Sequence, residues 1–172
     1  MAHAPRADWE DSVRLIEECA GLEDAIQGVL AEAFGRDLEA KLVDALRRDG
    51  SLAVSVAAGC TGGVCGYVAL SRLQSPPYAL ALAPVGVRKA MQGQGIGSAL
   101  IRRAIGRARA LGYGSIFVLG APAYYGRFGF SAEAAAAFPS PYSGPHFMGL
   151  HLTPRQDAPA AVIYAGAFDL LG

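Results

Sequence analysis

Apolar residues recur at the three- and four-residue spacing of a helix in three stretches of the chain. The first covers residues 22–34, with Gly35 directly after it, and the second covers residues 38–48 and closes on two arginines. The third runs over residues 96–111, with apolar residues on one side and arginines over much of the rest. Helices commonly end at a glycine and carry basic residues in their last turn. The pattern therefore predicts three helices, each with one buried face.

Short apolar runs between and around these stretches predict the strands of a sheet. In chain order the expected strands cover residues 12–19, 51–58, 64–73, 79–87, 115–120, 145–154 and 160–168. The order of elements predicts an α/β (α+β) fold, in which helices cover both faces of a mixed sheet. The length predicts one domain over residues 1–172, and residues 1–11 are expected to be a loose lead-in.

The strand expected at residues 79–87 contains two residues that disturb sheet pairing. Pro84 has no backbone N–H to donate to a neighbouring strand, and Gly86 weakens a strand because it has no side chain to pack. The two residues lie close together in the sequence, which predicts a bulge or a break in pairing at this point.

The composition is that of a globular domain that needs neither metal nor disulfide to fold. Hydrophobic residues make up 52% of the 172 residues, and no apolar run is long enough to span a membrane. The start of the chain is polar and acidic, unlike a signal peptide. Cys19, Cys60 and Cys65 are odd in number and lack the spacing of metal ligands, so free thiols in a cytoplasmic protein are expected, with no metal site.

Charge is divided unevenly along a chain whose formal net charge is zero. Residues 1–86 hold 7 basic and 12 acidic residues, a net charge of −5, whereas residues 87–172 hold 8 and 3, a net charge of +5. No acidic residue occurs between Arg88 and Ala132. This half favours an anionic ligand; general nucleic-acid binding is disfavoured, because it would call for a chain that is basic overall.

A loop with three alternating glycines lies at the centre of the positive half. Gly93, Gly95 and Gly97 stand between the irregular strand and the third helix. A helix begins with unpaired amides and a partial positive charge, and glycines let a ligand approach the backbone closely. Residues 92–98 therefore predict a phosphate site. The spacing differs from both the dinucleotide fingerprint and the P-loop, since neither G-x-G-x-x-G nor a following Lys-Ser/Thr is present.

Two motifs resemble those of the GNAT superfamily of N-acetyltransferases. Gln92-x-x-Gly95-x-Gly97, between a strand and a helix, resembles the segment that binds the acetyl-CoA pyrophosphate in that superfamily. The segment from Tyr125 to Phe130 resembles its Tyr-x-x-x-Gly-Phe motif. The sequence of residues 80–130 is similar to sequences of the bacterial YhbS-like subgroup of N-acetyltransferases.

The resemblance implies the fold and the cosubstrate. It implies a twisted, mostly antiparallel mixed sheet whose fourth and fifth strands splay apart, and acetyl-CoA as cosubstrate, with the pantetheine arm in the gap. By position, Val85 and Val87 are expected to meet the arm through their backbone. The residues expected to bind the pyrophosphate are Gln92, Gly93, Gln94, Gly95, Ile96, Gly97 and Ser98.

The resemblance also implies the reaction, direct attack of a primary amine on the thioester in a ternary complex. A backbone amide within residues 85–87 is expected to stabilise the oxyanion. Tyr125 matches the motif tyrosine and is expected to be the general acid, because a tyrosine with a pKa of about 10 is protonated at neutral pH. Its neighbour Tyr124 is the rival, and either ring could instead serve only in packing.

Several roles stay open at this level. Glu133, His146 and His151 are candidate bases, and Arg88 and Lys89 could meet the phosphates. The partner is an unidentified amine, no membrane partner is expected, and late strands could join two subunits in a homodimer. The competing functions are an acyl-CoA-sensing module without turnover and an RNA-associated protein.

Overall fold

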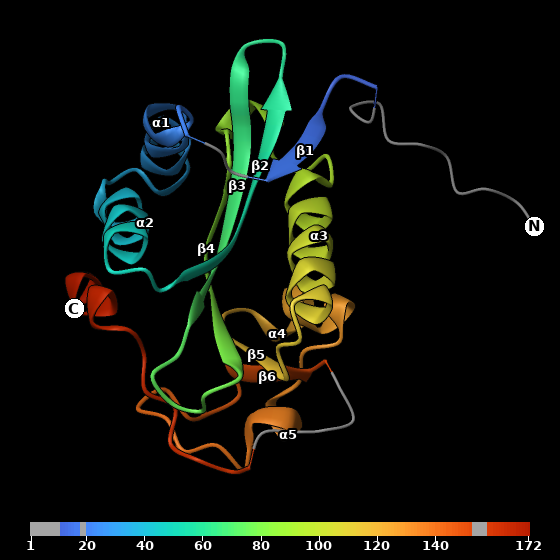
Figure 1. The fold of residues 1–172 in the computed structure, drawn as a ribbon. Coiled ribbons are helices and arrows are strands. Elements are labelled where there is room, and N and C mark those ends of the chain that lie inside the picture. Colours follow the sequence, from blue (N-terminus) through green and yellow to red (C-terminus); the bar gives the residue numbers. More distant parts are fainter. Residues whose placement is uncertain (1–10, 18–19, 153–157) are drawn as a thin grey trace, which may run out of the picture.

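The structure of the chain is a computed structural model and describes residues 11–17, 20–152 and 158–172. Its centre is one six-stranded sheet in which the strands lie in sequence order (Figure 1). Neighbouring strands are antiparallel except β4 and β5, which are parallel, and this confirms the mixed, mostly antiparallel sheet. The strands are β1 (Arg14–Glu17), β2 (Leu52–Cys60), β3 (Gly63–Arg72), β4 (Ala79–Val87), β5 (Ser115–Leu119) and β6 (Phe147–His151).

Helices cover both faces of the sheet. α1 (Glu23–Phe34) and α2 (Leu38–Arg48) lie on one face, and α3 (Ile96–Ala110) lies on the other (Figure 1). These three match the three helices predicted from apolar spacing. The shorter elements are η1 (Lys89–Met91), α4 (Pro122–Tyr125), η2 (Gly126–Phe128), α5 (Ala132–Ala135) and η3 (Gly166–Leu171). No helix in the described ranges has the length and apolar character that a membrane crossing requires.

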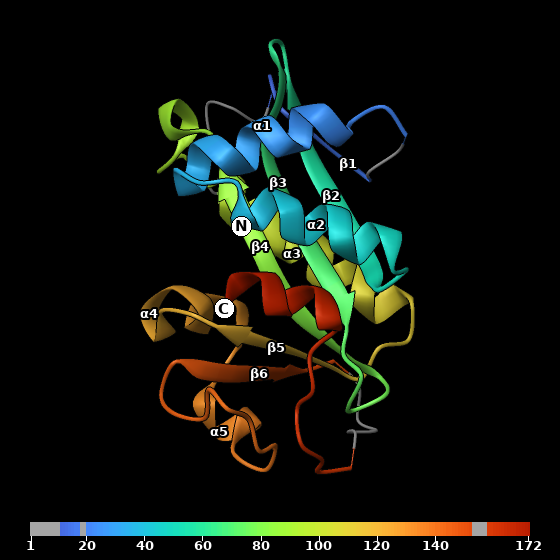
Figure 2. The same ribbon diagram turned by 90° about the vertical axis from the view of Figure 1, so that its left-hand side faces the viewer.

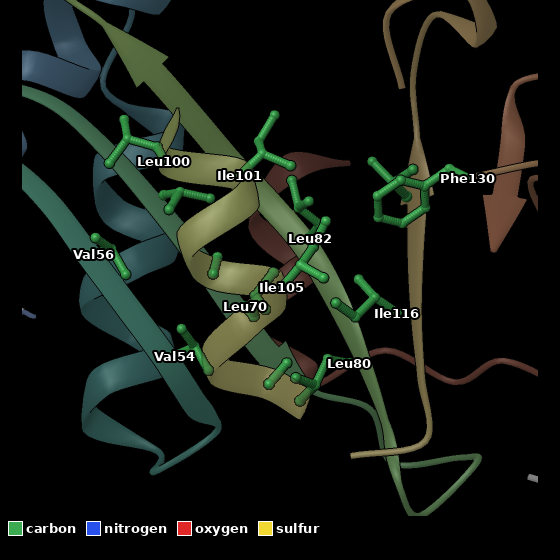
Figure 3. Packing of buried hydrophobic residues seen from close by; sticks show 14 of the residues in the cluster. Val54, Val56, Leu70, Leu80, Leu82, Leu100, Ile101, Ile105, Ile116 and Phe130 are labelled. Carbon is green, nitrogen blue, oxygen red and sulfur yellow. The ribbon is translucent and has the colours of Figure 1, made fainter. Parts of the chain in front are cut away.

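The core beneath α3 fixes where that helix begins. Its apolar face packs on β2, β3 and β4, and Figure 3 shows Leu100, Ile101 and Ile105 among side chains of those strands. Gly95 caps the helix at φ 95°, a left-handed conformation that favours glycine. The packed face thus sets the rotation of α3, and the glycine sets its first turn beside the end of β4.

β4 carries the irregularity that Pro84 and Gly86 predict. Val85 pairs with Val68 and Leu82 pairs with Leu70, so two residues of β4 stand opposite one residue of β3. This is a β-bulge, which bends a strand and interrupts its ladder. The predicted disturbance is therefore confirmed.

β4 and β5 part soon after they meet. In the described part of the chain they pair only where Ala79–Ala81 face Ser115–Phe117, so residues 82–87 have no strand partner on that side. Figure 2 shows β5 and β6 running away from the direction of β4. The expected splayed pair is thus present, and its gap opens toward the glycine loop.

The last predicted strand, at residues 160–168, is wrong. Ile163 makes one isolated bridge with Ser75, after which the chain turns into η3. Ala165 and its neighbours Phe168 and Leu171 pack against α2 instead of pairing with a sheet. A short apolar run does not by itself distinguish a strand from a buried helical turn.

Candidate active site

A cleft of about 450 Å³ lies between the second half of β4, the glycine loop and α4. Ala33 and Phe34 of α1 close it from the other face of the sheet. It brings together all but one of the residues expected to bind the cosubstrate; Gln94 is not among the residues that line it. The expected residues in the lining are Val85, Val87, Gln92, Gly93, Gly95, Ile96, Gly97 and Ser98.

The glycine loop presents backbone amides to this cleft. Gly93 and Gly95 have φ values of 76° and 95°, which residues with a Cβ adopt only with strain. The first backbone bond of α3 runs from the amide of Ala99 to the carbonyl of Gly95, at 3.0 Å. The amides just before it belong to the helix end that has no intrahelical acceptors, and that end carries partial positive charge. The loop therefore has the backbone geometry and the partial charge that favour a bound anion.

Two side chains fasten the loop to the sheet. Gln92 lines the cleft and donates from Nε2 to the carbonyl of Val87 at 2.9 Å, so its side chain is engaged within the protein. Arg88 donates to the carbonyl of Val64 at 2.8 Å and to Glu32 at 2.6 Å. The amide of Lys89 and the Arg88 guanidinium both bond the Glu32 carboxylate and lower its pKa. Arg88 thus ties β4 to α1 and β3.

Arg127 is a site residue that the sequence reasoning did not single out. Its guanidinium carbon lies 4.5 Å from the centre of the Tyr124 ring, and its Nη2 lies 3.4 Å from Ser98 Oγ. It lines the cleft beside the first turn of α3 and adds a full positive charge there. A signal was present in the sequence, because Arg127 is the one Lys or Arg between Arg109 and Arg155.

The two neighbouring tyrosines meet different parts of the site. Tyr124 lines the cleft, and its hydroxyl would lie 3.1 Å from a Cβ placed on Gly97. Tyr125 does not line the cleft; its ring covers Gly120, just after β5, where a Cβ would overlap the ring. Its ring also packs edge-on against Phe130, with centroids 5.9 Å apart. Burial, with a smaller contribution from Tyr124, raises the pKa of Tyr125 to about 12, so its hydroxyl is protonated at neutral pH.

The candidate bases lie in different surroundings. His151 accepts from Ser115 Oγ at Nδ1 (3.0 Å) and donates from Nε2 to the carbonyl of Ala134 (3.1 Å), which leaves no lone pair for a substrate proton. His146 is exposed, and its Nδ1 lies 3.1 Å from the carbonyl of Gly120. Glu133 lies in α5, which packs on β6. Within the described residues, no three His, Cys, Asp or Glu side chains group as metal ligands would.

The splayed parallel strands and the glycine-capped helix start beside them are features of the N-acetyltransferase fold. The sequence model of the acetyltransferase (GNAT) family matches residues 17–130. The chain belongs to this family, and the resemblance found in the two sequence motifs is confirmed.

Bacterial relatives place the chain with the YhbS-like members. The N-acetyltransferase YhbS of Escherichia coli K12 is 38% identical over 113 residues, which are 63% of this chain and 68% of that protein. The crystal structure of Escherichia coli YhbS in complex with CoA is 28% identical and superposes with a TM-score of 0.86. The match covers 100% of this chain and 98% of the YhbS chain. A GNAT acetyltransferase of Brucella melitensis in complex with acetyl-CoA has a TM-score of 0.78 and 31% identity, over 91% of this chain and 98% of its own.

Proposed function

We propose that the chain moves the acetyl group of acetyl-CoA to a primary amine by direct attack in a ternary complex. The observation that carries this proposal is the cleft that joins the amides of the glycine loop to the unpaired edge of β4. Similar structures hold CoA and acetyl-CoA, which supports acetyl-CoA as the cosubstrate here.

The diphosphate would lie on the loop and the first turn of α3. Backbone amides of residues 92–98 would donate to it, and Arg127 would add charge beside the first turn of α3. The pantetheine arm would then follow β4, where Val85 and Val87 offer backbone groups with no strand partner on the β5 side. The arm would take the place of a neighbouring strand.

The chain has two tasks once amine and thioester are aligned. As the amine nitrogen attacks the carbonyl carbon, a C–N bond forms, the C–S bond breaks, and a backbone amide near Val85 stabilises the negative oxygen. The departing thiolate takes a proton from a tyrosine hydroxyl, and the proton of the amine passes to solvent.

The places of the two rings beside β4 and β5 favour Tyr125 over Tyr124 as the proton donor. The Tyr124 hydroxyl stands at Gly97, beside Val87, where the arm would enter. Tyr125 stands at Gly120, at the end of β5 and nearer the place where β4 and β5 meet. An arm that enters from the loop would pass Tyr124 first and reach Tyr125 with its thioester.

The proposal is tested by following free CoA release from acetyl-CoA with a panel of amines. We expect turnover that saturates in both substrates and that produces one N-acetylated amine for each CoA. Initial rates should give intersecting lines for two varied substrates, since both must be bound together. Parallel lines, together with an acetylated protein trapped by mass spectrometry, would overturn the direct-attack mechanism.

A further inference from the structure

A second cavity lies against the same pair of strands as the cosubstrate cleft. It measures about 300 Å³, and we call it the aromatic pocket. Ala83 lies in its wall, two residues from Val85 of the cosubstrate cleft, and Leu119 lies in its wall next to Gly120 beneath Tyr125. The two cavities share no lining residue, but they flank the same stretch of β4 and the same end of β5. The aromatic pocket is lined by Ala81, Leu82, Ala83, Phe117, Val118, Leu119, Tyr142, Tyr164, Phe168, Leu171 and Gly172.

The late segments of the chain build the outer wall of the aromatic pocket. η3 docks on α2, and Figure 2 shows it lying across the sheet between α2 and β5. This docking holds Phe168 in place, with its ring centre 5.0 Å from that of Tyr164. Tyr142 meets Tyr164 edge-on at 5.8 Å. Three aromatic rings thus form a continuous wall, and the exposed side chains of Tyr142 and Leu119 mark its opening.

No side chain in this lining carries a charge. Burial, with a smaller contribution from Tyr142, raises the pKa of Tyr164 to about 12, so the phenol stays neutral. A carboxylate bound here would lose its hydration without gaining an opposite charge, which is costly. Free amino acids carry such a group, and polyamines lack an aromatic body to fill the pocket. An apolar or aromatic group would instead pack against the apolar and aromatic side chains of the pocket.

We propose that the aromatic pocket binds the acceptor and that the acceptor is a small primary amine with an uncharged aromatic body. This inference rests on the proposed function. The body would lie between Phe117 and the wall formed by Tyr142, Tyr164 and Phe168, and the amine would reach the thioester through the gap beside Ala83. A volume of about 300 Å³ suits a single ring system and its short chain, at the lower end of small-molecule sites.

The apolar lining also accounts for the nucleophile. An ammonium that enters an apolar pocket is destabilised relative to the neutral amine, so its pKa falls and its proton is released to solvent. The neutral nitrogen then forms the C–N bond as the C–S bond breaks, and the sulfur takes the proton of the tyrosine. A pocket of this kind supplies a free amine without a dedicated base.

Matched amines test the inference. We expect 2-phenylethylamine and tryptamine to be acetylated with kcat/KM at least about 100-fold above phenylalanine, which differs from 2-phenylethylamine by one carboxylate, and above spermidine. This ratio corresponds to about 2.7 kcal/mol, the cost expected for one charge left without a partner. Equal or greater rates with phenylalanine or spermidine would overturn the inference, as would no turnover of either arylalkylamine.

A rim variant provides the second test. Leu119→Glu places a carboxylate at the opening of the aromatic pocket, at a side chain that is already 50% exposed. We expect kcat/KM for 2-phenylethylamine to fall at least tenfold and that for a diamine to rise. Leu111→Glu, at a site with the same exposure at the far end of α3, should change neither. Equal effects of the two variants would contradict the assignment.

Calorimetry with acetyl-CoA alone distinguishes a failure of the acceptor assignment from a failure of the proposed function. Binding of acetyl-CoA without turnover of an arylalkylamine means that the acceptor assignment fails while the cosubstrate site stands. Failure to bind acetyl-CoA at all means that the proposed function itself fails.

Discussion

Tyr125 and Tyr124 follow one another in α4, yet they are expected to affect different steps. We expect Tyr125→Phe to lower kcat on the order of 10²-fold, because the leaving thiolate would lose its proton donor. Tyr124→Phe removes a hydroxyl that faces the cleft near Gly97 and should mainly raise the KM for acetyl-CoA. Steady-state kinetics of the two variants with one amine decide the matter. A loss of kcat in Tyr124→Phe alone would reverse the two roles.

Arg127 should strengthen the binding of acetyl-CoA by contact with the phosphates of that ligand. We expect Arg127→Ala to weaken acetyl-CoA binding roughly tenfold, about 1.4 kcal/mol, as for a lost hydrogen bond to a charged group. Arg103→Ala, at an exposed arginine of α3 away from the cleft, is the control and should bind as the native protein does.

An acetyl-pantetheine without the diphosphate sharpens this prediction. It should bind native protein and Arg127→Ala equally, because the charge that Arg127 meets is absent from it. A comparable loss of affinity with both ligands would show that Arg127 acts on the shape of the cleft and not on the phosphates.

At the scale of single residues, sequence reasoning reached some positions and missed others. The loop glycines were found because helix starts and left-handed glycines bind anions by a general mechanism. Arg127 was missed because it meets Ser98 from 29 positions away, and a spacing of that length leaves no periodic pattern. The use of the Gln92 side chain within the protein was missed for a related reason, since its partner carbonyl belongs to the strand before the loop.

Two glycines of α3 give a matched test at the scale of the helix. A Cβ at Gly97 would lie 3.1 Å from the Tyr124 hydroxyl, whereas a Cβ at Gly106 would meet nothing within 4 Å. Gly106→Ala should stabilise the protein by about 0.5–1 kcal/mol through helix propensity and leave acetyl-CoA binding unchanged. Thermal unfolding and calorimetry measure both quantities.

Gly97→Ala should gain the same helix propensity but place a methyl group in the cleft. We expect acetyl-CoA affinity to fall about fivefold to tenfold, about 1–1.4 kcal/mol, since the arm and the first turn of α3 would no longer approach closely. Unchanged affinity would mean that the cosubstrate does not pass Gly97.

The elements themselves were predictable where one periodicity was clear. The three long helices were found because each has one continuous apolar face and a recognisable end. The bulge of β4 was found because Pro84 cannot donate to a ladder. The structure of residues 160–168 was not predicted correctly, because it depends on packing against the apolar face of α2, which lies far away in the sequence.

At the scale of the whole molecule, the uneven charge is used locally. Arg88 pairs with Glu32 and Arg107 pairs with Glu17, so basic residues of the second half bind acidic residues of the first. Among the residues that the structure describes, Arg127 is the Lys or Arg that lines the cleft. This distribution favours one bound anion over an extended nucleic-acid surface, and assembly into a homodimer stays a prediction.

A calorimetric titration of the native protein with acetyl-CoA, in the absence of any amine, tests the cosubstrate site most directly. We expect saturable binding of one molecule for each chain, weakened in Arg127→Ala and Gly97→Ala and unchanged in Arg103→Ala. The absence of any binding heat at several temperatures, or equal affinities for all four proteins, would contradict the claim that the glycine loop and the parted strands hold this cosubstrate.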